Sequence, residues 1–199
     1  MFDDKKYQVI RNAISYDLAN FIFNYLLMRR DCAHYMYSNN IIDSNTHYGT
    51  WTDKQVPNVY SEYGNGVMET LLMKTLPIIK EHVGLDLLPT YAYTRLYERG
   101  CELKKHKDRP SCEISGTLHL GGNQWDIFMG DNKIDLNIGD MLIYAGCDLE
   151  HWRDPFNGDL CGQVFLHYNK ANGQYADRNL YDGRAMLGLP AICKIKKWK

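Results

Sequence analysis

The strongest constraint on the fold is a region, residues 88–170, in which short strand-like segments alternate with turn residues. Successive side chains of a strand point to opposite faces, so residues 90–97 place several large polar side chains on one face. Many short strands separated by turns are typical of a β-sandwich or a β-barrel. We predict strands at 90–97, 113–120, 124–129, 133–136, 141–144 and 163–168, with 130–132 as a hairpin turn.

The residues before this region favour helices. Residues 15–30 have apolar side chains at helical spacing, with Ser15 as the expected N-cap and the Arg29-Arg30 pair as the expected C-terminal turn. A second helix is predicted over 66–83. Pro77 lies inside that second helix and is expected to bend or split it.

These patterns fit one domain of 199 residues, since a domain usually has about 100–200 residues. Within it we distinguish a helical support (1–87), a strand-rich core (88–170) and a C-terminal extension (171–199). A polar segment, 38–62, interrupts the helical support. Long irregular segments are often functional, so this segment and the C-terminal extension are candidate lids.

Composition excludes several classes of protein. The chain has 23 basic and 24 acidic residues and a net charge of −1, which disfavours a protein that coats nucleic acid or an anionic membrane. Its apolar runs are far shorter than the ~20 residues that span a bilayer. None of the six cysteines forms a Cys-x-x-Cys pair and no signal peptide is recognisable. We therefore expect free thiols and a cytoplasmic location.

The candidate chemistry lies in two short stretches. His106-x-Asp108 would place an imidazole and a carboxylate on one side if it lies near a strand end, because side chains alternate with a period of two. Forty-three residues after Asp108, His151 follows another strand and a turn. A barrel wall of this kind can aim this histidine back at the first pair. Two histidines and one carboxylate form the metal site of non-haem Fe(II) oxygenases.

Together these stretches resemble the Fe(II)- and 2-oxoglutarate-dependent dioxygenases, in particular the prolyl-4-hydroxylase-like branch. The resemblance covers about residues 88–169 and includes Tyr97-x-x-Gly100, His106-x-Asp108, Gly139-Asp140 before a strand, and His151. It implies an α+β protein with a double-stranded β-helix, a jelly-roll or cupin-like barrel, supported by N-terminal helices. It also implies that His106, Asp108 and His151 bind the metal and form the catalytic centre.

The resemblance further implies the reaction and its cofactors. These would be Fe(II), 2-oxoglutarate and O₂, with ascorbate as an additional reductant. The expected reaction is hydroxylation of a prolyl residue or a related C–H bond in a peptide or amino acid, with release of succinate and CO₂. The alternatives are a nucleic-acid demethylase of the same superfamily and a non-enzymatic metal-binding jelly roll. The net charge of −1 disfavours a nucleic-acid partner. We expect a peptide or small-molecule substrate and no membrane partner, and the sequence indicates no oligomeric state.

The sequence departs from the family at the co-substrate site. The family usually has an Arg or Lys about ten residues after the distal histidine to pair with the far carboxylate of 2-oxoglutarate, and this chain has Cys161 there. Leu103 also stands where prolyl hydroxylases often have a tyrosine. A buried carboxylate needs a cation or several donors, so another residue must provide them.

We expect Arg95, together with Tyr97, to be this anchor. The two share a face of the first barrel strand, which in this fold lies beside the last strand. Arg153 and Arg109 are the rival cations, and Gln163 is a neutral donor on the last strand.

The remaining histidines are expected to be structural. His119 and His167 lie within predicted strands and are interpreted as hydrogen-bonded core residues, whereas His34, His47 and His82 lie outside the barrel.

Overall fold

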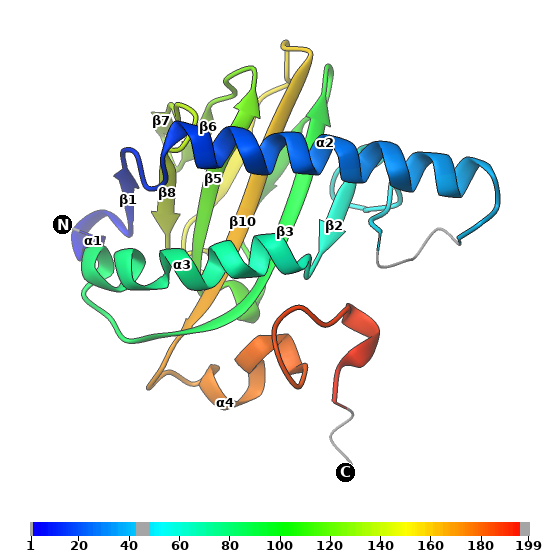
Figure 1. The fold of residues 1–199 in the computed structure, drawn as a ribbon. Coiled ribbons are helices and arrows are strands. Elements are labelled where there is room, and N and C mark those ends of the chain that lie inside the picture. The colour runs from blue at the N-terminus through cyan, green and yellow to red at the C-terminus, as the bar shows by residue number, and fades with distance from the viewer. Residues whose placement is uncertain (1, 43–47, 196–199) are drawn as a thin grey trace.

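The computed structural model describes residues 2–42 and 48–195. Their strands form two antiparallel sheets, which face each other as a double-stranded β-helix (Figure 1). The larger sheet has the order β1 (Tyr7–Ile10), β8 (Met141–Tyr144), β5 (Ile114–Gly122), β10 (Leu160–Lys170), β3 (Leu87–Glu98) and β2 (Ser61–Tyr63). The smaller sheet has the order β4 (Leu103–His106), β9 (His151–Arg153), β6 (Ile127–Met129) and β7 (Asn132–Ile134). The predicted fold class is confirmed.

Every strand predicted from the sequence is present, with ends that shift by a few residues. The expected hairpin joins β6 to β7 and pairs Met129 with Asn132. The sequence analysis missed β1, β2, β4 and β9, of three or four residues each. Such short strands show too little alternation to be recognised. Two of them, β1 and β2, lie within residues 1–87 and extend the larger sheet at both edges.

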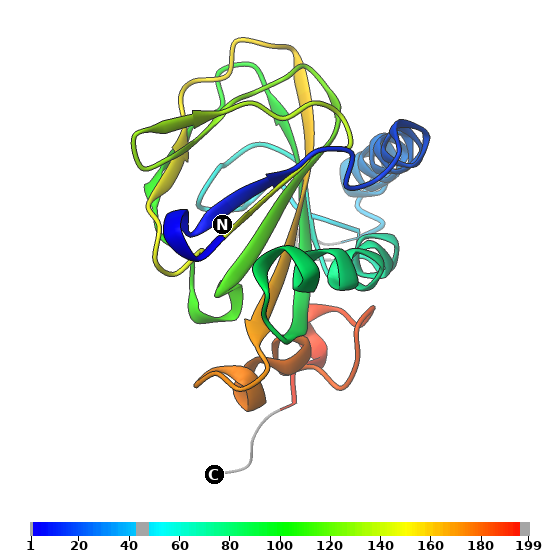
Figure 2. The same ribbon diagram turned by 90° about the vertical axis from the view of Figure 1, so that its left-hand side faces the viewer.

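Two long helices cover the outer face of the larger sheet, α2 (Tyr16–Ser38) and α3 (Gly66–Val83), after a short α1 (Phe2–Lys5). Figure 2 shows both long helices on one side of the barrel. Ser15 caps α2 as predicted, because its hydroxyl accepts the Leu18 N–H at 3.3 Å. The predicted end of α2 at the arginine pair is wrong. Arg29 binds Glu62 of β2 at 2.5 Å instead of the helix terminus, and the helix continues for two further turns to Ser38.

Of the two effects expected of Pro77, a bend or a split, the split does not occur, because α3 is continuous from Gly66 to Val83. Proline removes the hydrogen bond to the carbonyl four residues earlier, that of Met73. Met73 lies on the exposed side of the helix, where water can satisfy that carbonyl. On the opposite face Leu72 and Ile79 are buried in the core on both sides of the proline, and this packing keeps the two halves together. Gly84 ends the helix in the left-handed conformation, as its position predicts.

The main hydrophobic core lies between these helices and the larger sheet. Leu26 of α2 and Leu72 of α3 pack there against Leu96 of β3 and Leu166 of β10. The other face of β3 and β10 lines the interior of the barrel. These two strands are therefore buried on both faces, and polar side chains on their inner faces are removed from bulk water.

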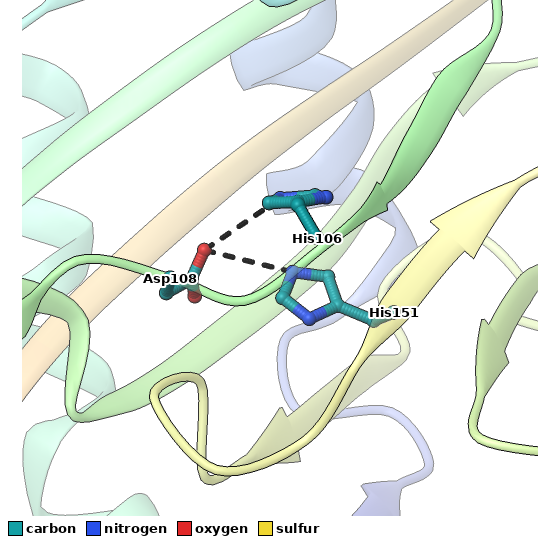
Figure 3. A group of neighbouring side chains, drawn as sticks. All are labelled: His106, Asp108 and His151. Carbon is teal, nitrogen blue, oxygen red and sulfur yellow. Dashed lines mark ion pairs between the residues drawn. The ribbon is translucent and has the colours of Figure 1, made fainter.

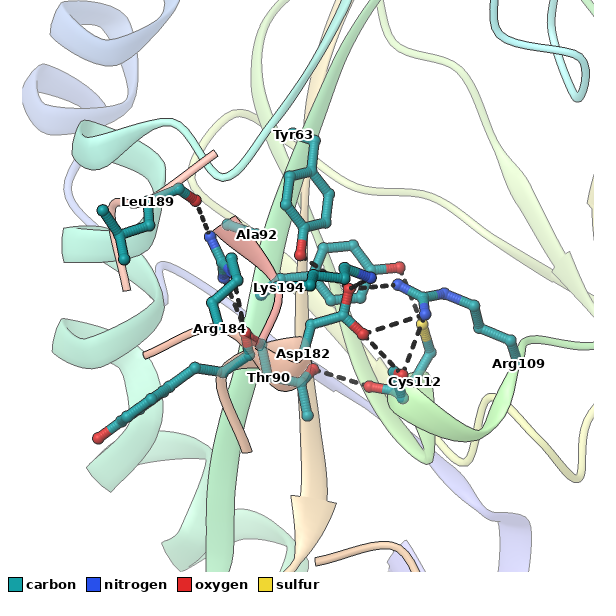
Figure 4. A network of polar contacts seen from close by, with 12 residues as sticks. Tyr63, Thr90, Ala92, Arg109, Cys112, Asp182, Arg184, Leu189 and Lys194 are labelled. Carbon is teal, nitrogen blue, oxygen red and sulfur yellow. Dashed lines mark hydrogen bonds and ion pairs between the residues drawn. The ribbon is translucent and has the colours of Figure 1, made fainter. Parts of the chain in front are cut away.

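The C-terminal extension packs beside the end of the barrel (Figure 2). It contains α4 (Ala176–Asn179) and 3₁₀ turns at Leu180–Gly183 and Ala191–Cys193; a further 3₁₀ turn, Pro110–Cys112, precedes β5. Arg184 forms a completely buried ion pair with Glu69 of α3 at 2.5 Å, and Asp182 binds Arg109 (Figure 4). Two ion pairs thus fasten the extension to the barrel. None of the described helices has the length and apolar character needed to cross a bilayer.

Candidate metal centre

The three predicted ligands come together at one end of the barrel (Figure 3). His106 is the last residue of β4 and His151 the first of β9, and the two are register partners in the smaller sheet. Asp108 follows β4 and points its Oδ1 at both rings, 3.8 Å from Nε2 of His106 and 3.5 Å from Nε2 of His151. The three ligand atoms all lie within 4.8 Å of one another, close enough to share one metal ion.

Hydrogen bonds orient both histidine rings toward the centre. Nδ1 of His106 lies 2.8 Å from the carbonyl oxygen of Lys104, and Nδ1 of His151 lies 3.1 Å from that of Leu149. A carbonyl only accepts, so each Nδ1 carries a proton and donates it, and Nε2 is the ring nitrogen that faces the centre. Burial and the neighbouring His151 lower the pKa of His106, which favours the neutral ring that a metal needs. The donor set fits a divalent transition metal such as Fe(II).

The carboxyl group of Asp108 is ionised in this environment. Burial alone raises its pKa, but hydrogen bonding and charge from His151, together with His167 and Ser115, outweigh burial and hold the pKa of Asp108 below its usual value. The site therefore presents two imidazoles and one ionised carboxylate. The carboxylate attracts a cation, and three protein ligands leave further positions on a metal open to other ligands.

A cavity of about 360 Å³ opens beside the three ligands. As predicted for the inward face of the first barrel strand, Arg95 of β3 and the three tyrosines that alternate with it line the cavity. The segment 38–62 contributes two further residues to the wall, Asp53 and Gln55. Part of the candidate lid thus lies against the cavity, where its polar groups contact the site.

Arg95 is the most enclosed cation on the cavity wall, with a side chain that is 3% exposed. Its Nη2 lies 2.8 Å from Oδ2 of Asp53, and its Nη1 donates to Oη of Tyr97 at 3.1 Å and to Oε1 of Gln55 at 3.2 Å. Its Nε has no hydrogen-bond partner among the described residues. The first barrel strand lies beside the last one, as expected, because Arg95 of β3 is paired with Gln163 of β10.

Arg153 lies deeper in the barrel and is completely enclosed. It shares a buried face of β9 with His151, and its guanidinium lies over the ring of Trp125 at 5.1 Å. Nη1 donates to the carbonyl of Trp125, while Nε and Nη2 have no partner in the described part of the chain. Burial lowers the pKa of Arg153. Burial raises the pKa of the Cys161 thiol, and the charge of Arg153 opposes that rise. Cys161 stands at the position where the family usually has its cation. Arg95, which lines the cavity and has an unpartnered Nε, thus fits an anionic co-substrate.

The other two predicted co-substrate residues already have partners. Arg109 lies at the rim and binds Asp182 through both terminal nitrogens, each at 3.0 Å (Figure 4). Gln163 is buried, and its amide contacts Thr117 at 3.2 Å and the sulfur of Cys161 at 3.3 Å.

Sequence reasoning missed several contacts of this centre. Nε2 of Gln55 lies 2.9 Å from Nε2 of His106, and Ser115 binds Asp108 at 2.8 Å. His167 is buried and hydrogen-bonded, as expected, but it lines the cavity and contacts Ser115. His119 is a core residue whose two ring nitrogens face carbonyl oxygens. No pattern in the sequence singles out Gln55 or Ser115.

His34 and His82 lie outside the barrel on α2 and α3, and His47 is outside the described residues. The six cysteines are free thiols in the structure.

No family model and no curated protein matches the sequence. Solved structures do match the fold. A Pseudomonas putida prolyl-4-hydroxylase superimposes with a TM-score of 0.59 at 14% identity, covering 83% of this chain and 94% of that one. The chain has the fold of the 2-oxoglutarate–Fe(II) oxygenases.

Two further structures with this fold contain ligands. The viral collagen prolyl hydroxylase of Paramecium Bursaria Chlorella virus-1, in complex with 2-oxoglutarate, gives a TM-score of 0.58 at 12% identity over 83% of this chain and 97% of that one. HygX from Streptomyces hygroscopicus, with nickel, 2-oxoglutarate and hygromycin B bound, gives a TM-score of 0.62 at 11% identity over 86% of this chain and 85% of that one.

Proposed function

We propose that this protein is an Fe(II)- and 2-oxoglutarate-dependent oxygenase in which His106, Asp108 and His151 hold the iron. The observation that carries the proposal is the convergence of three ligand atoms within 4.8 Å, with both imidazoles bonded through Nδ1 so that Nε2 faces the centre. Ligand-binding histidines in proteins usually donate their second nitrogen to a carbonyl or carboxylate in this way. Similar folds that bind nickel and 2-oxoglutarate support the same assignment.

We propose that Arg95, with the hydroxyl of Tyr97, holds the far carboxylate of 2-oxoglutarate. Arg95 reaches the cavity surface, has an unpartnered Nε, and already binds one carboxylate, that of Asp53. A guanidinium offers two parallel donors to a carboxylate, which is a stronger match than a neutral amide provides. Arg153 is the second candidate, favoured by its two unpartnered nitrogens.

When bound, Fe(II) with 2-oxoglutarate supplies the oxidising chemistry that inserts one oxygen atom from O₂ into a substrate C–H bond, with release of succinate and CO₂. The chain's own residues would bind the metal and orient the co-substrate. His106 and His151 would hold the metal through Nε2, and Asp108 contributes the negative charge.

For the substrate we propose a prolyl residue or a related C–H bond of a peptide or amino acid. Two of the proteins with a similar fold are prolyl hydroxylases. The tyrosines on the cavity wall offer apolar faces with hydroxyl groups at their tips, which suits a small ring or side chain. With six free thiols, we also propose that the protein works in a reducing compartment such as the cytoplasm.

The test is a turnover assay with Fe(II), labelled 2-oxoglutarate and ascorbate, first without substrate and then with a panel of prolyl peptides, free amino acids and methylated oligonucleotides. We expect iron-dependent release of labelled CO₂, stimulated by a peptide or amino acid that gains 16 Da. His151→Ala is the inactive control. Absence of CO₂ release from the iron-loaded protein with every substrate would contradict the oxygenase assignment. Stimulation by methylated oligonucleotides alone would favour a demethylase instead.

A further inference from the structure

We propose that Ser115 and His167 are positioning residues that hold Asp108 in the orientation required for metal binding. This inference rests on the proposed function, since it concerns the same metal centre. Neither residue belongs to the ligand set, and neither lies near Asp108 in a recognisable motif. The structure nevertheless links them in a chain from the last barrel strand to the carboxylate.

The two oxygens of Asp108 have different surroundings. Oδ1 faces the centre, 3.5 Å from Nε2 of His151. Oδ2 lies 2.8 Å from Oγ of Ser115. Because a carboxylate can rotate about its last bond, a fixed partner on Oδ2 determines where Oδ1 points. Ser115 therefore selects the oxygen that is presented to the metal.

The direction of the hydrogen bonds follows from what each group can donate. Ionised Asp108 only accepts, and an ionised acceptor attracts the Ser115 proton more strongly than a neutral one. Nδ1 of His167 lies 3.0 Å from the same Oγ, so it acts as the donor and the Ser115 oxygen as its acceptor. The chain runs from His167 through Ser115 to Asp108, and each link fixes the next.

The surroundings make this chain rigid. Ser115 of β5 and His167 of β10 are register partners in the larger sheet, and both are buried. The ring of Tyr91 packs on His167 with centroids 4.5 Å apart. On the other side, Gly146 lies so close that a Cβ atom there would overlap Oδ2 of Asp108 and the Cys112 carbonyl. The carboxylate is thus confined between a glycine and a hydroxyl.

Loss of a residue that hydrogen-bonds a metal ligand without touching the metal usually weakens metal binding about 10- to 100-fold. We therefore expect Ser115→Ala to raise the Kd for Co(II), used as the spectroscopic probe for the site, by at least about tenfold. Co(II) affinity is measured by titrating its visible absorption, which also reports the coordination geometry.

Thr117→Val provides a matched control. Thr117 lies two residues further along β5 and is equally buried. Its hydroxyl contacts the Gln163 amide. We expect this variant to bind Co(II) like the wild type. If Ser115→Ala also binds Co(II) like the wild type, or if both variants lose affinity equally while remaining folded, the positioning role is wrong.

A second pair of variants separates hydrogen bonding from packing at His167. Asparagine places an N–H close to the position of Nδ1, whereas leucine has a similar shape and no donor. Both remove the ring that Tyr91 contacts. We expect His167→Asn to keep Co(II) affinity within about threefold and His167→Leu to lose about tenfold, in the range usual for residues that support a metal ligand. Equal loss in both would overturn the donor role of His167.

The same titration separates this inference from the proposed function. If wild-type protein binds Co(II) and His106→Ala abolishes binding, the metal centre is correct and the variants above test Ser115 and His167 alone. If His106→Ala binds Co(II) as tightly as wild type, the metal centre itself is wrong and the inference falls with it.

Discussion

The carboxylate of Asp53 lies 2.8 Å from Nη2 of Arg95, inside the cavity beside the metal ligands. It also accepts a hydrogen bond from the hydroxyl of Tyr93. Burial raises the pKa of Asp53, but the charge of Arg95 and the Tyr93 bond outweigh burial and keep the pKa below its usual value. Asp53 is therefore an ionised internal partner for the cation that we propose as the 2-oxoglutarate anchor.

An internal carboxylate on Arg95 competes with the carboxylate of 2-oxoglutarate. We expect Asp53→Asn to lower the KM for 2-oxoglutarate about three- to tenfold, equivalent to about 0.7–1.4 kcal/mol. The measurement is the initial rate of CO₂ release at varied 2-oxoglutarate concentration. Asp159→Asn is the control, because it breaks another Arg–Asp pair, with Arg99, on the surface. An unchanged or higher KM in Asp53→Asn would show that Asp53 does not compete.

Removal of the anchor has the opposite effect. Breaking a buried charge pair costs about 3–5 kcal/mol, so Arg95→Met should raise the KM for 2-oxoglutarate by about two orders of magnitude or more. Metal affinity should hardly change. Because Arg95→Met leaves Asp53 without its cation, the double variant Arg95→Met with Asp53→Asn serves as the folding control. A KM that stays within a few-fold in these variants but rises steeply in Arg153→Met would assign the anchor to Arg153.

Loss of one ligand should remove the metal without unfolding the barrel. His151 contributes its ring to the centre, but the main core lies on the other side of the larger sheet, between the sheet and α2 and α3. We expect His151→Ala to abolish CO₂ release and Co(II) binding while the protein still unfolds in a single cooperative transition in urea. Turnover at the wild-type rate in this variant would exclude His151 as a ligand.

Local patterns predicted that His106 and Asp108 lie near each other and which face of β3 carries Arg95. The spacing of His106 and Asp108 follows from a strand end, and the face that carries Arg95 follows from the two-residue period of a strand. These features depend on neighbours in sequence. The register that places His151 opposite His106 is not local, and the sequence indicated only that a histidine after a strand and a turn could be aimed back at the first pair.

Contacts between distant residues could not be predicted. Asp53 reaches Arg95 across 42 positions from an irregular segment that has no periodicity. Ser115 and His167 are 52 positions apart, and their contact depends on the pairing of β5 with β10. The sequence indicated an ordinary core histidine at position 167. A core histidine and a histidine that positions a metal ligand are both buried and hydrogen-bonded, so the sequence does not distinguish them.

The C-terminal extension gives a pH-dependent prediction that does not involve the metal. The buried carboxylate of Asp182 accepts hydrogen bonds from Arg109, Lys194 and Tyr63. Burial raises its pKa, but these partners outweigh burial and hold the pKa of Asp182 well below its usual value. An unfolded aspartate has a pKa of about 3.9. The ion pairs therefore contribute their full stability above about pH 5 and lose it as the pH falls, because only the unfolded state then takes up a proton.

Asp182→Asn tests this linkage, since asparagine fills the same space and does not titrate. Hydrogen bonds to charged groups contribute about 1.5–3 kcal/mol each, but Arg109 and Lys194 are about half exposed, so solvent screening reduces their contribution. We expect the variant to lose about 1–3 kcal/mol of unfolding free energy at pH 7. The difference from wild type should shrink steadily between about pH 4 and pH 2, as measured by urea unfolding at each pH. Asp177→Asn, in the short helix α4 of the same extension, is the control and should show no such trend. A difference that stays constant over this range would mean that Asp182 stabilises the extension through shape and not through charge.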